Sequence, residues 1–280
     1  LISLHSPDGL LASSFAVHRS LDAAGALLGP LAAFALLAWI PGRYDAVWLT
    51  SFVFALLGVA VIALLVPNAA RVPASPASPP LSISFRRFWQ ETSLRRLSAA
   101  ATFLAIATAS DGFLYLVFAN KTGANASSIP IFFVITAALY MICSMPLGSL
   151  ADRWGRKPVL LTGYLFLTAA YLLLWLTPRS FGLPLQVLFF LLMGFYFAAT
   201  EGILTAMASS LIPAAHRGSG LAVFASLIGL GKMVSSVTFG WLWHSRGFDA
   251  AIPWFIAALM AALFFSALRI PASSSYHEAA

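Results

Sequence analysis

Long runs of apolar residues dominate this chain. A helix needs about 20 mostly apolar residues to cross the hydrocarbon core of a bilayer. Four stretches meet this length without any charged residue: 46–66, 129–151, 158–178 and 250–268. Four more carry a charge inside the stretch or near one end: 20–40, 97–119, 183–212 and 218–243. The pattern therefore predicts eight transmembrane helices and an all-α integral membrane fold.

The composition excludes a soluble helical bundle. The chain is 60% hydrophobic and 9% charged, with a mean hydropathy of +0.90. Soluble domains are about 25% charged. A soluble bundle would also need polar outer faces on its helices, and the eight stretches lack them.

The net charge of +7 is distributed unevenly over the connections between the predicted helices. Every second connection, together with the end of the last helix, holds most of the basic residues. They are Arg71, Arg86, Arg87, Arg95, Arg96, Arg153, Arg156, Lys157, Arg217 and Arg269. The intervening connections hold only Arg43, Lys121, Arg179 and Arg246. Cytoplasmic loops of membrane proteins are enriched in Lys and Arg. We therefore expect both termini to be cytoplasmic, together with 67–96, 152–157 and 213–217, and we expect no nucleic-acid partner.

One connection separates two predicted helices from the other six. Residues 67–80 are rich in Pro, Ala and Ser, which is typical of a flexible linker. Residues 81–96 place aromatic residues at helical spacing against arginines, which predicts an amphipathic helix on the membrane surface. The expected organisation is listed in chain order: two helices in 1–66, a cytoplasmic linker in 67–96, six helices in 97–270 and a cytoplasmic tail in 271–280.

A short charged motif follows the apolar stretch 129–151. Its residues fit the pattern G-x-x-x-D-(R/K)-x-G-(R/K)-(R/K): Gly148, Asp152, Arg153, Gly155, Arg156 and Lys157. This motif resembles the cytoplasmic-loop signature of the major facilitator superfamily of secondary transporters. The resemblance implies two six-helix halves joined by a long loop, and transport by alternating access. If 67–96 is that loop, the chain matches helices five to twelve of twelve.

A second motif supports this alignment. Gly25, Gly29 and Pro30 resemble the G-x-x-x-G-P element on the fifth helix of drug-proton antiporters in the same superfamily. Small residues let a neighbouring helix approach closely, and proline loosens the backbone ladder. The resemblance implies a proton-coupled exporter of a drug or small solute. Its first four helices would precede Leu1. The alternative is a truncated, non-transporting membrane protein or an assembly partner.

Three ionisable residues lie inside predicted membrane spans: Asp111, Glu201 and Lys232. Placing such a group at the bilayer centre costs about 2.5–3.5 kcal/mol on insertion scales, so each is a candidate for function. The resemblance places them on helices seven, ten and eleven, which line the central cavity of the superfamily. We expect Glu201 or Asp111 to carry the transported proton, and Lys232 to be its charge partner or a contact for an anion. The alternative is a purely structural Glu201–Lys232 ion pair.

Two further sets of residues leave alternatives open. The resemblance implies that Asp152 and the basic residues of the loop form a latch that closes in one conformation and opens in another. The simpler interpretation is that the basic residues only fix the membrane topology: Arg153, Arg156 and Lys157. Four aromatic residues are candidates for substrate contact, or else for packing and interface anchoring: Tyr115, Tyr140, Tyr196 and Trp241.

Enzyme chemistry finds little support in the sequence. Ser219 and His244 lie at opposite ends of one predicted helix, about 37 Å apart at about 1.5 Å per residue. The single cysteine, Cys143, permits no disulfide within the chain, and we expect no metal and no cofactor. The expected partners are membrane lipid, a small-molecule substrate and protons, in a bacterial plasma (inner) membrane.

The topology can be tested with two introduced cysteines. Ser75 lies in the expected cytoplasmic linker and Lys121 in an expected outer connection. Ser75→Cys and Lys121→Cys should react with an impermeant thiol reagent from opposite sides of the membrane. Reaction of both from the same side would contradict the helix count.

Overall fold

The computed structural model describes residues 25, 27–65, 89–212 and 217–270. A short apolar helix, Leu27–Trp39, comes before the first labelled helix. The labelled elements are α3 (Tyr44–Leu65), α5 (Thr92–Ala107), α6 (Asp111–Thr122), the 3-10 helix η1 (Ala126–Ser128), α7 (Ile129–Trp154), α8 (Arg156–Leu176), α9 (Leu183–Leu211), α10 (Arg217–Arg246) and α11 (Phe248–Arg269). No strand occurs in the part of the chain described.

The predicted spans agree closely with these helices. Over the described ranges, seven stretches are long and apolar enough to cross a membrane, with α5 and α6 together forming one of them. The eighth prediction, 20–40, overlaps the shorter helix Leu27–Trp39, while residues 20–24 and 26 lie outside the described residues. The all-α membrane fold predicted from the sequence is confirmed.

The stretch 97–119 differs from its prediction as a single helix. The helix stops after Ala107 and a new one starts at Asp111, with extended backbone between them. Thr108 has φ −98° and ψ 110°, and Ser110 has φ −59° and ψ 137°. No proline lies in this break. The residues around the break, Thr108 to Gly112, are more polar than their flanks, but this run is too short to divide the predicted span.

The start of α5 also differs from the expected boundary. The helix begins at Thr92, so Thr92–Arg96 form its first turns, although the sequence assigned them to the amphipathic linker helix. Leu94 and Leu97 of these turns are buried in the bundle. Residues 67–88, which hold most of the predicted linker and surface helix, lie outside the described residues.

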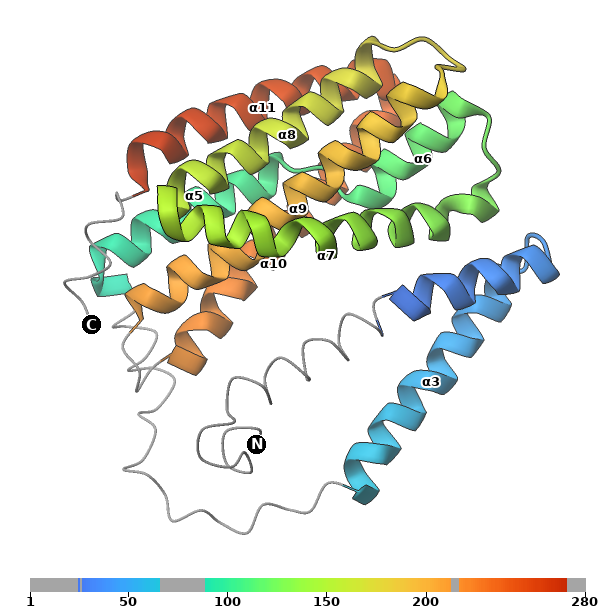
Figure 1. The fold of residues 1–280 in the computed structure, drawn as a ribbon, viewed down its shortest axis with the longest axis horizontal. Coiled ribbons are helices and arrows are strands. Elements are labelled where there is room, and N and C mark those ends of the chain that lie inside the picture. The colour runs from blue at the N-terminus through green and yellow to red at the C-terminus, as the bar shows by residue number, and fades with distance from the viewer. Residues whose placement is uncertain (1–24, 26, 66–88, 213–216, 271–280) are drawn as a thin grey trace.

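Helices α5 to α11 pack as one bundle in which two sequential groups exchange their first helices (Figure 1). α9 packs along α7 and α8, whereas α5 packs along α10 and α11. Thus α5, the first helix of the segment 97–178, lies against the last two helices of 183–268. In the same way α9, the first helix of 183–268, lies against the last two helices of 97–178. Such reciprocal packing is expected of two three-helix repeats, and α8 with α11 joins the groups.

Three glycines bring helix backbones close together in this bundle. A Cβ added to Gly194 of α9 would lie 2.5 Å from the Cβ of Leu139 on α7. A Cβ on Gly163 of α8 would lie 2.8 Å from the Cβ of Ala199 on α9. At Gly231 of α10, the carbonyl oxygen of Thr102 on α5 would be 3.1 Å away. Helices in lipid associate mainly by such close packing, because the lipid tails are as apolar as the side chains.

The helices before the linker pack differently. No residue in the most apolar part of α3 is buried, and Figure 1 shows this blue hairpin to one side of the bundle. A Cβ added to Gly25 or to Gly29 would meet no atom within 4 Å. The packing role of the Gly25, Gly29 and Pro30 motif therefore stays a prediction, and among the described residues no helix packs against its glycines.

On the predicted outer side, Lys121 ties two connections together. Its Nζ donates to the Thr177 carbonyl oxygen at 2.7 Å, and its own carbonyl oxygen accepts from the Ser180 N–H at 2.6 Å. Lys121 is half-buried, whereas Arg179 in the same region is exposed. Arg179→Cys is therefore a second label position for the outer side.

The close approach at Gly194 can be tested by adding one methyl group. Gly194→Ala should push α7 and α9 apart and destabilise the folded protein by about 1–3 kcal/mol, the usual cost of overpacking a core. Thermal unfolding in detergent, followed by loss of the monodisperse peak in size-exclusion chromatography, measures the change.

Gly229→Ala is the matched control, because a Cβ at Gly229 of α10 meets no atom within 4 Å. Alanine is favoured over glycine inside a helix by about 0.8–1.0 kcal/mol, so this variant should be neutral or more stable. Equal stability of both variants would contradict the packing role of Gly194.

Candidate functional site

Two adjoining cavities lie inside the bundle formed by α5 to α11. The larger has a volume of about 500 Å³ and the smaller about 160 Å³. Four residues belong to the walls of both: Thr108, Tyr196, Glu201 and Lys232. These shared residues come from the α5–α6 break, from α9 and from α10, so the site depends on three segments distant in sequence.

The three ionisable residues predicted from the sequence all line the smaller cavity. Glu201 of α9 and Lys232 of α10 line both cavities, and Asp111 at the start of α6 lines the smaller one. Both Lys232 and Asp111 lie close enough to Glu201 to interact with it electrostatically. Two carboxyl groups and one amine thus share one cavity of the bundle.

Glu201 and Lys232 are not in direct contact in this conformation. Within the described part of the chain, the ion pair closer than 4 Å is that of Arg43 and Asp45, at 2.7 Å in an exposed connection. Glu201 and Lys232 are both exposed residues. A closed structural ion pair, the alternative weighed from the sequence, is absent between these two described side chains.

The helix break contributes backbone and a carboxylate to the smaller cavity. Thr108, Ala109 and Ser110 line it together with Asp111. Asp111 Oδ1 accepts from the Gly112 N–H at 2.9 Å and from Ser110 Oγ at 3.3 Å. This places a carboxylate at the N-terminus of α6, where the partial positive charge of the helix dipole favours it.

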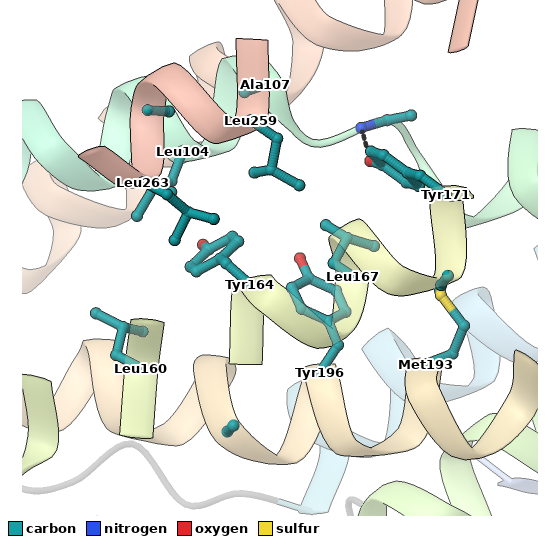
Figure 2. Close-up of a cluster of buried hydrophobic side chains, with 14 of the residues drawn as sticks. Leu104, Ala107, Leu160, Tyr164, Leu167, Tyr171, Met193, Tyr196, Leu259 and Leu263 are labelled. Carbon is teal, nitrogen blue, oxygen red and sulfur yellow. Dashed lines mark hydrogen bonds between the residues drawn. The ribbon is translucent and has the colours of Figure 1, made fainter. Parts of the chain in front are cut away.

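Tyrosines supply much of the remaining wall of the larger cavity. Tyr140, Tyr164 and Tyr196 all line it, and the rings of Tyr164 and Tyr196 lie 5.6 Å apart between centroids. Figure 2 shows these two side chains, from α8 and α9, side by side among buried leucines. Tyr140 and Tyr196 were candidates from the sequence. Tyr164 was not, because α8 corresponds to an outer scaffold helix in the resemblance.

The other two aromatic candidates lie elsewhere. Tyr115 is buried outside both cavities, and its hydroxyl donates to Thr136 Oγ1 at 2.7 Å. Trp241 is 63% exposed and lines neither cavity.

A signal for Tyr164 did exist in the sequence. Tyr164 and Tyr171 lie seven residues apart in a mostly apolar span and so share one helix face.

In the charged loop between α7 and α8, two basic side chains bind backbone carbonyl groups of other helices. Gly155 joins the helices with φ 95°, a conformation that favours glycine. Arg156 Nη1 donates to the Ala206 carbonyl oxygen of α9 at 3.3 Å. Lys157 Nζ donates to the carbonyl oxygens of Ala267 and Ile270 at 2.7 and 2.8 Å. Two of the three basic residues therefore bind the ends of other helices in the same bundle.

The remaining loop residues are less constrained by the described contacts. Arg153 is exposed, and a Cβ added to Gly148 would meet no atom within 4 Å. Asp152 belongs to α7, but its side chain lies outside the description. The latch predicted for this loop thus stays a prediction. The contacts of Lys157 at the end of α11 are those expected of a cation at a helix C-terminus.

The described residues offer little for a metal ion. They contain no group of three or more His, Cys, Asp or Glu side chains that could hold one. Cys143 of α7 is half-buried. The chemistry available at the shared wall is therefore that of two carboxyl groups, an amine and several hydroxyl groups.

Comparison with known proteins places this site in a family. Residues 97–279 match the Major Facilitator Superfamily. The chain is 26% identical over 269 residues to Uncharacterized protein Rv2265 of Mycobacterium tuberculosis, covering 92% of this chain and 62% of the relative. It is 25% identical over 243 residues to Uncharacterized MFS-type transporter MJ1317 of Methanocaldococcus jannaschii, covering 83% of this chain and 58% of the relative.

A shorter match, 31% identical over 129 residues, links the chain to Uncharacterized MFS-type transporter Rv2456c of Mycobacterium tuberculosis and covers 42% of this chain and 28% of the relative. The chain thus spans about three fifths of the length of the longer-matching relatives, 62% and 58%. The family match, by contrast, covers all six helical spans of the bundle that holds the cavities. This multi-pass membrane chain belongs to the Major Facilitator Superfamily.

Proposed function

We propose that the protein is a secondary transporter that moves a small solute or drug by alternating access, with export driven by protons. The observation that carries this proposal is the meeting of Asp111, Glu201 and Lys232 at the wall of one cavity. These residues come from three different helices, so a change of charge at one of them alters the forces on the other two.

Glu201 is the proposed proton carrier. Its residue lines both cavities, and its carboxyl group has no hydrogen-bond or ion-pair partner among the described side chains, so water in the cavity can reach it. An ionisable group inside a membrane span is costly unless it faces such a cavity. A carboxyl group can gain or lose a proton without changing its shape, which suits repeated cycling.

Lys232 and Asp111 are the charged neighbours through which protonation of Glu201 changes the electrostatics of the site. With Glu201 ionised, Lys232 is attracted toward it, and with Glu201 protonated that attraction is lost. Asp111, which lines the same smaller cavity, adds a second carboxyl group near Glu201. A solute that prefers one of these charge states is linked to the proton, because each ligand shifts the conformational equilibrium by its differential affinity.

The loop 148–157 is proposed to act at the cytoplasmic end of the same bundle. Arg156 and Lys157 bind the backbone of α9 and α11, so they couple the ends of these helices to α8. Asp152 and Arg153 are proposed to form the part of the latch that opens and closes. In this orientation both termini face the cytoplasm of a bacterial cell, with the protein in the inner membrane.

The transport proposal predicts a specific loss in Glu201→Gln. In the complete protein this variant should insert normally but lose proton-driven transport, because it removes the titrating group and keeps its shape. Asp111→Asn should weaken transport less. Candidate solutes are first screened in proteoliposomes by their ability to discharge a proton gradient, read with acridine orange, and the solute found then serves as the probe.

Glu91→Gln is the matched control for this test, since Glu91 undergoes the same chemical change in an exposed position before α5. Transport by this variant should equal that of the unmodified protein. Undiminished proton-driven transport by Glu201→Gln would remove Glu201 from the coupling mechanism.

A second variant separates coupling from structure. If Glu201 and Lys232 only stabilise each other, the double change Glu201→Gln with Lys232→Met should restore much of the activity lost in either single variant. Replacing both partners of a buried pair by neutral groups is often tolerated, whereas removing one partner leaves an uncompensated charge. We expect no restoration of proton-driven transport, and full restoration would favour the structural role.

A further inference from the structure

The break between α5 and α6 releases backbone polar groups inside the membrane. A regular helix would pair the Thr108 carbonyl oxygen and the Ala109 N–H within its own ladder, but both flanking residues are extended. Water is scarce at this depth, so each released group costs free energy unless another part of the protein binds it. The question is which side chains do so.

Two side chains from other helices bind both ends of one peptide group. The Ala109 N–H donates to the Tyr171 hydroxyl oxygen of α8 at 2.7 Å. The hydroxyl of Ser235 on α10 donates to the Thr108 carbonyl oxygen. Since the Thr108 carbonyl and the Ala109 N–H belong to the same peptide bond, this plane is held from two sides, an arrangement we name the peptide clamp.

The clamp is buried and lies beside the cavities. Tyr171 and Ser235 are both 0% exposed. Figure 2 shows Tyr171 on α8 with the dashed bond to the backbone of the break. Thr108 and Ala109 line the smaller cavity, and Ser236, next to Ser235, also lines it. The clamp thus joins the walls contributed by α8 and α10 to the break.

Asp111 lies two residues after the clamped peptide. Its position relative to Glu201 and Lys232 follows from the direction in which α6 leaves the break, and that direction is set by the orientation of the peptide plane. We propose that Tyr171 and Ser235 are positioning residues: by holding the Thr108–Ala109 peptide they aim α6 so that Asp111 faces the cavity it shares with Glu201 and Lys232.

The proposal rests on the proposed function in one respect, the use of Asp111 in transport. Its structural content is independent of any substrate. A role limited to stability would lower the unfolding temperature when a hydroxyl is removed but would leave α6 in place. A positioning role moves α6 relative to the rest of the bundle. The distance from α6 to a fixed helix therefore distinguishes the two.

Pulsed electron paramagnetic resonance on the 280-residue chain in lipid nanodiscs measures this distance. Cys143→Ser removes the native thiol, and spin labels are attached to cysteines at exposed positions. The pair Leu116 and Leu268 joins α6 to the far end of α11, while the pair Leu176 and Leu268 joins α8 to the same end. Only the first pair includes α6, so the second reports general loosening of the bundle.

In the double variant Tyr171→Phe with Ser235→Ala, the Leu116–Leu268 distance should shift by about 2 Å or broaden, which is the scale of helix shifts in conformational transitions. The Leu176–Leu268 distance should stay unchanged. The single variant Ser235→Thr keeps both hydroxyl groups of the clamp and should retain the original distance.

The matched control removes two other buried hydroxyl groups. Thr168 of α8 donates to a carbonyl of its own helix, and the Ser266 hydroxyl of α11 has no partner among the described residues. Thr168→Val with Ser266→Ala should leave both distances unchanged. An unchanged Leu116–Leu268 distance in the folded clamp variant, or equal changes in both label pairs, would overturn the positioning role.

Single variants cover the case in which the double variant does not fold. Tyr171→Phe and Ser235→Ala each remove one side of the clamp and should each move the Leu116–Leu268 distance. If each single loss also prevents folding while the control folds, the clamp serves stability alone and the proposal is overturned. None of these outcomes depends on transport. Failure of the transport proposal would instead appear as full transport activity in Glu201→Gln and Asp111→Asn.

Discussion

The scarcity of water inside a bilayer is the constraint on which the rest of this structure depends. Every backbone N–H and C=O group at that depth needs a partner within the protein, and a continuous helix provides one without help from side chains. The described spans are accordingly helical from end to end, with the break after Ala107 as the exception. There the partners come from Tyr171 and Ser235, and both residues are completely buried.

Close packing at small residues decides where the cavities lie. Gly194 and Gly163 bring α9 against α7 and α8, and Gly231 brings α10 against α5. Since the first helix of each three-helix group packs with the other group, α5–α6, α9 and α10 contribute to one shared wall. Asp111 and Glu201, 90 positions apart in sequence, line the same smaller cavity for this reason.

The candidate site was only partly predictable. Asp111, Glu201 and Lys232 were found because charge inside an apolar span is costly and therefore rare, which makes each instance conspicuous. Tyr164 and Tyr171 were missed because aromatic residues are common in membrane helices and their roles depend on what they face. Arg156 and Lys157 were identified as a motif, but their bonds to α9 and α11 required the positions of those helix ends.

The sequence by itself determined the position and apolar character of seven membrane spans, because the thickness of the hydrocarbon core sets a minimum length for every span. It also determined which residues are chemically unusual in that environment. Only the tertiary structure decided that α5 ends at Ala107. Polar residues at 108, 110 and 111 interrupt the apolar pattern too briefly to divide the span, and the freed peptide of the break is bound by side chains from α8 and α10. Long-range contacts of this kind leave no periodic signal along the chain, so they emerge only when the helices are packed together.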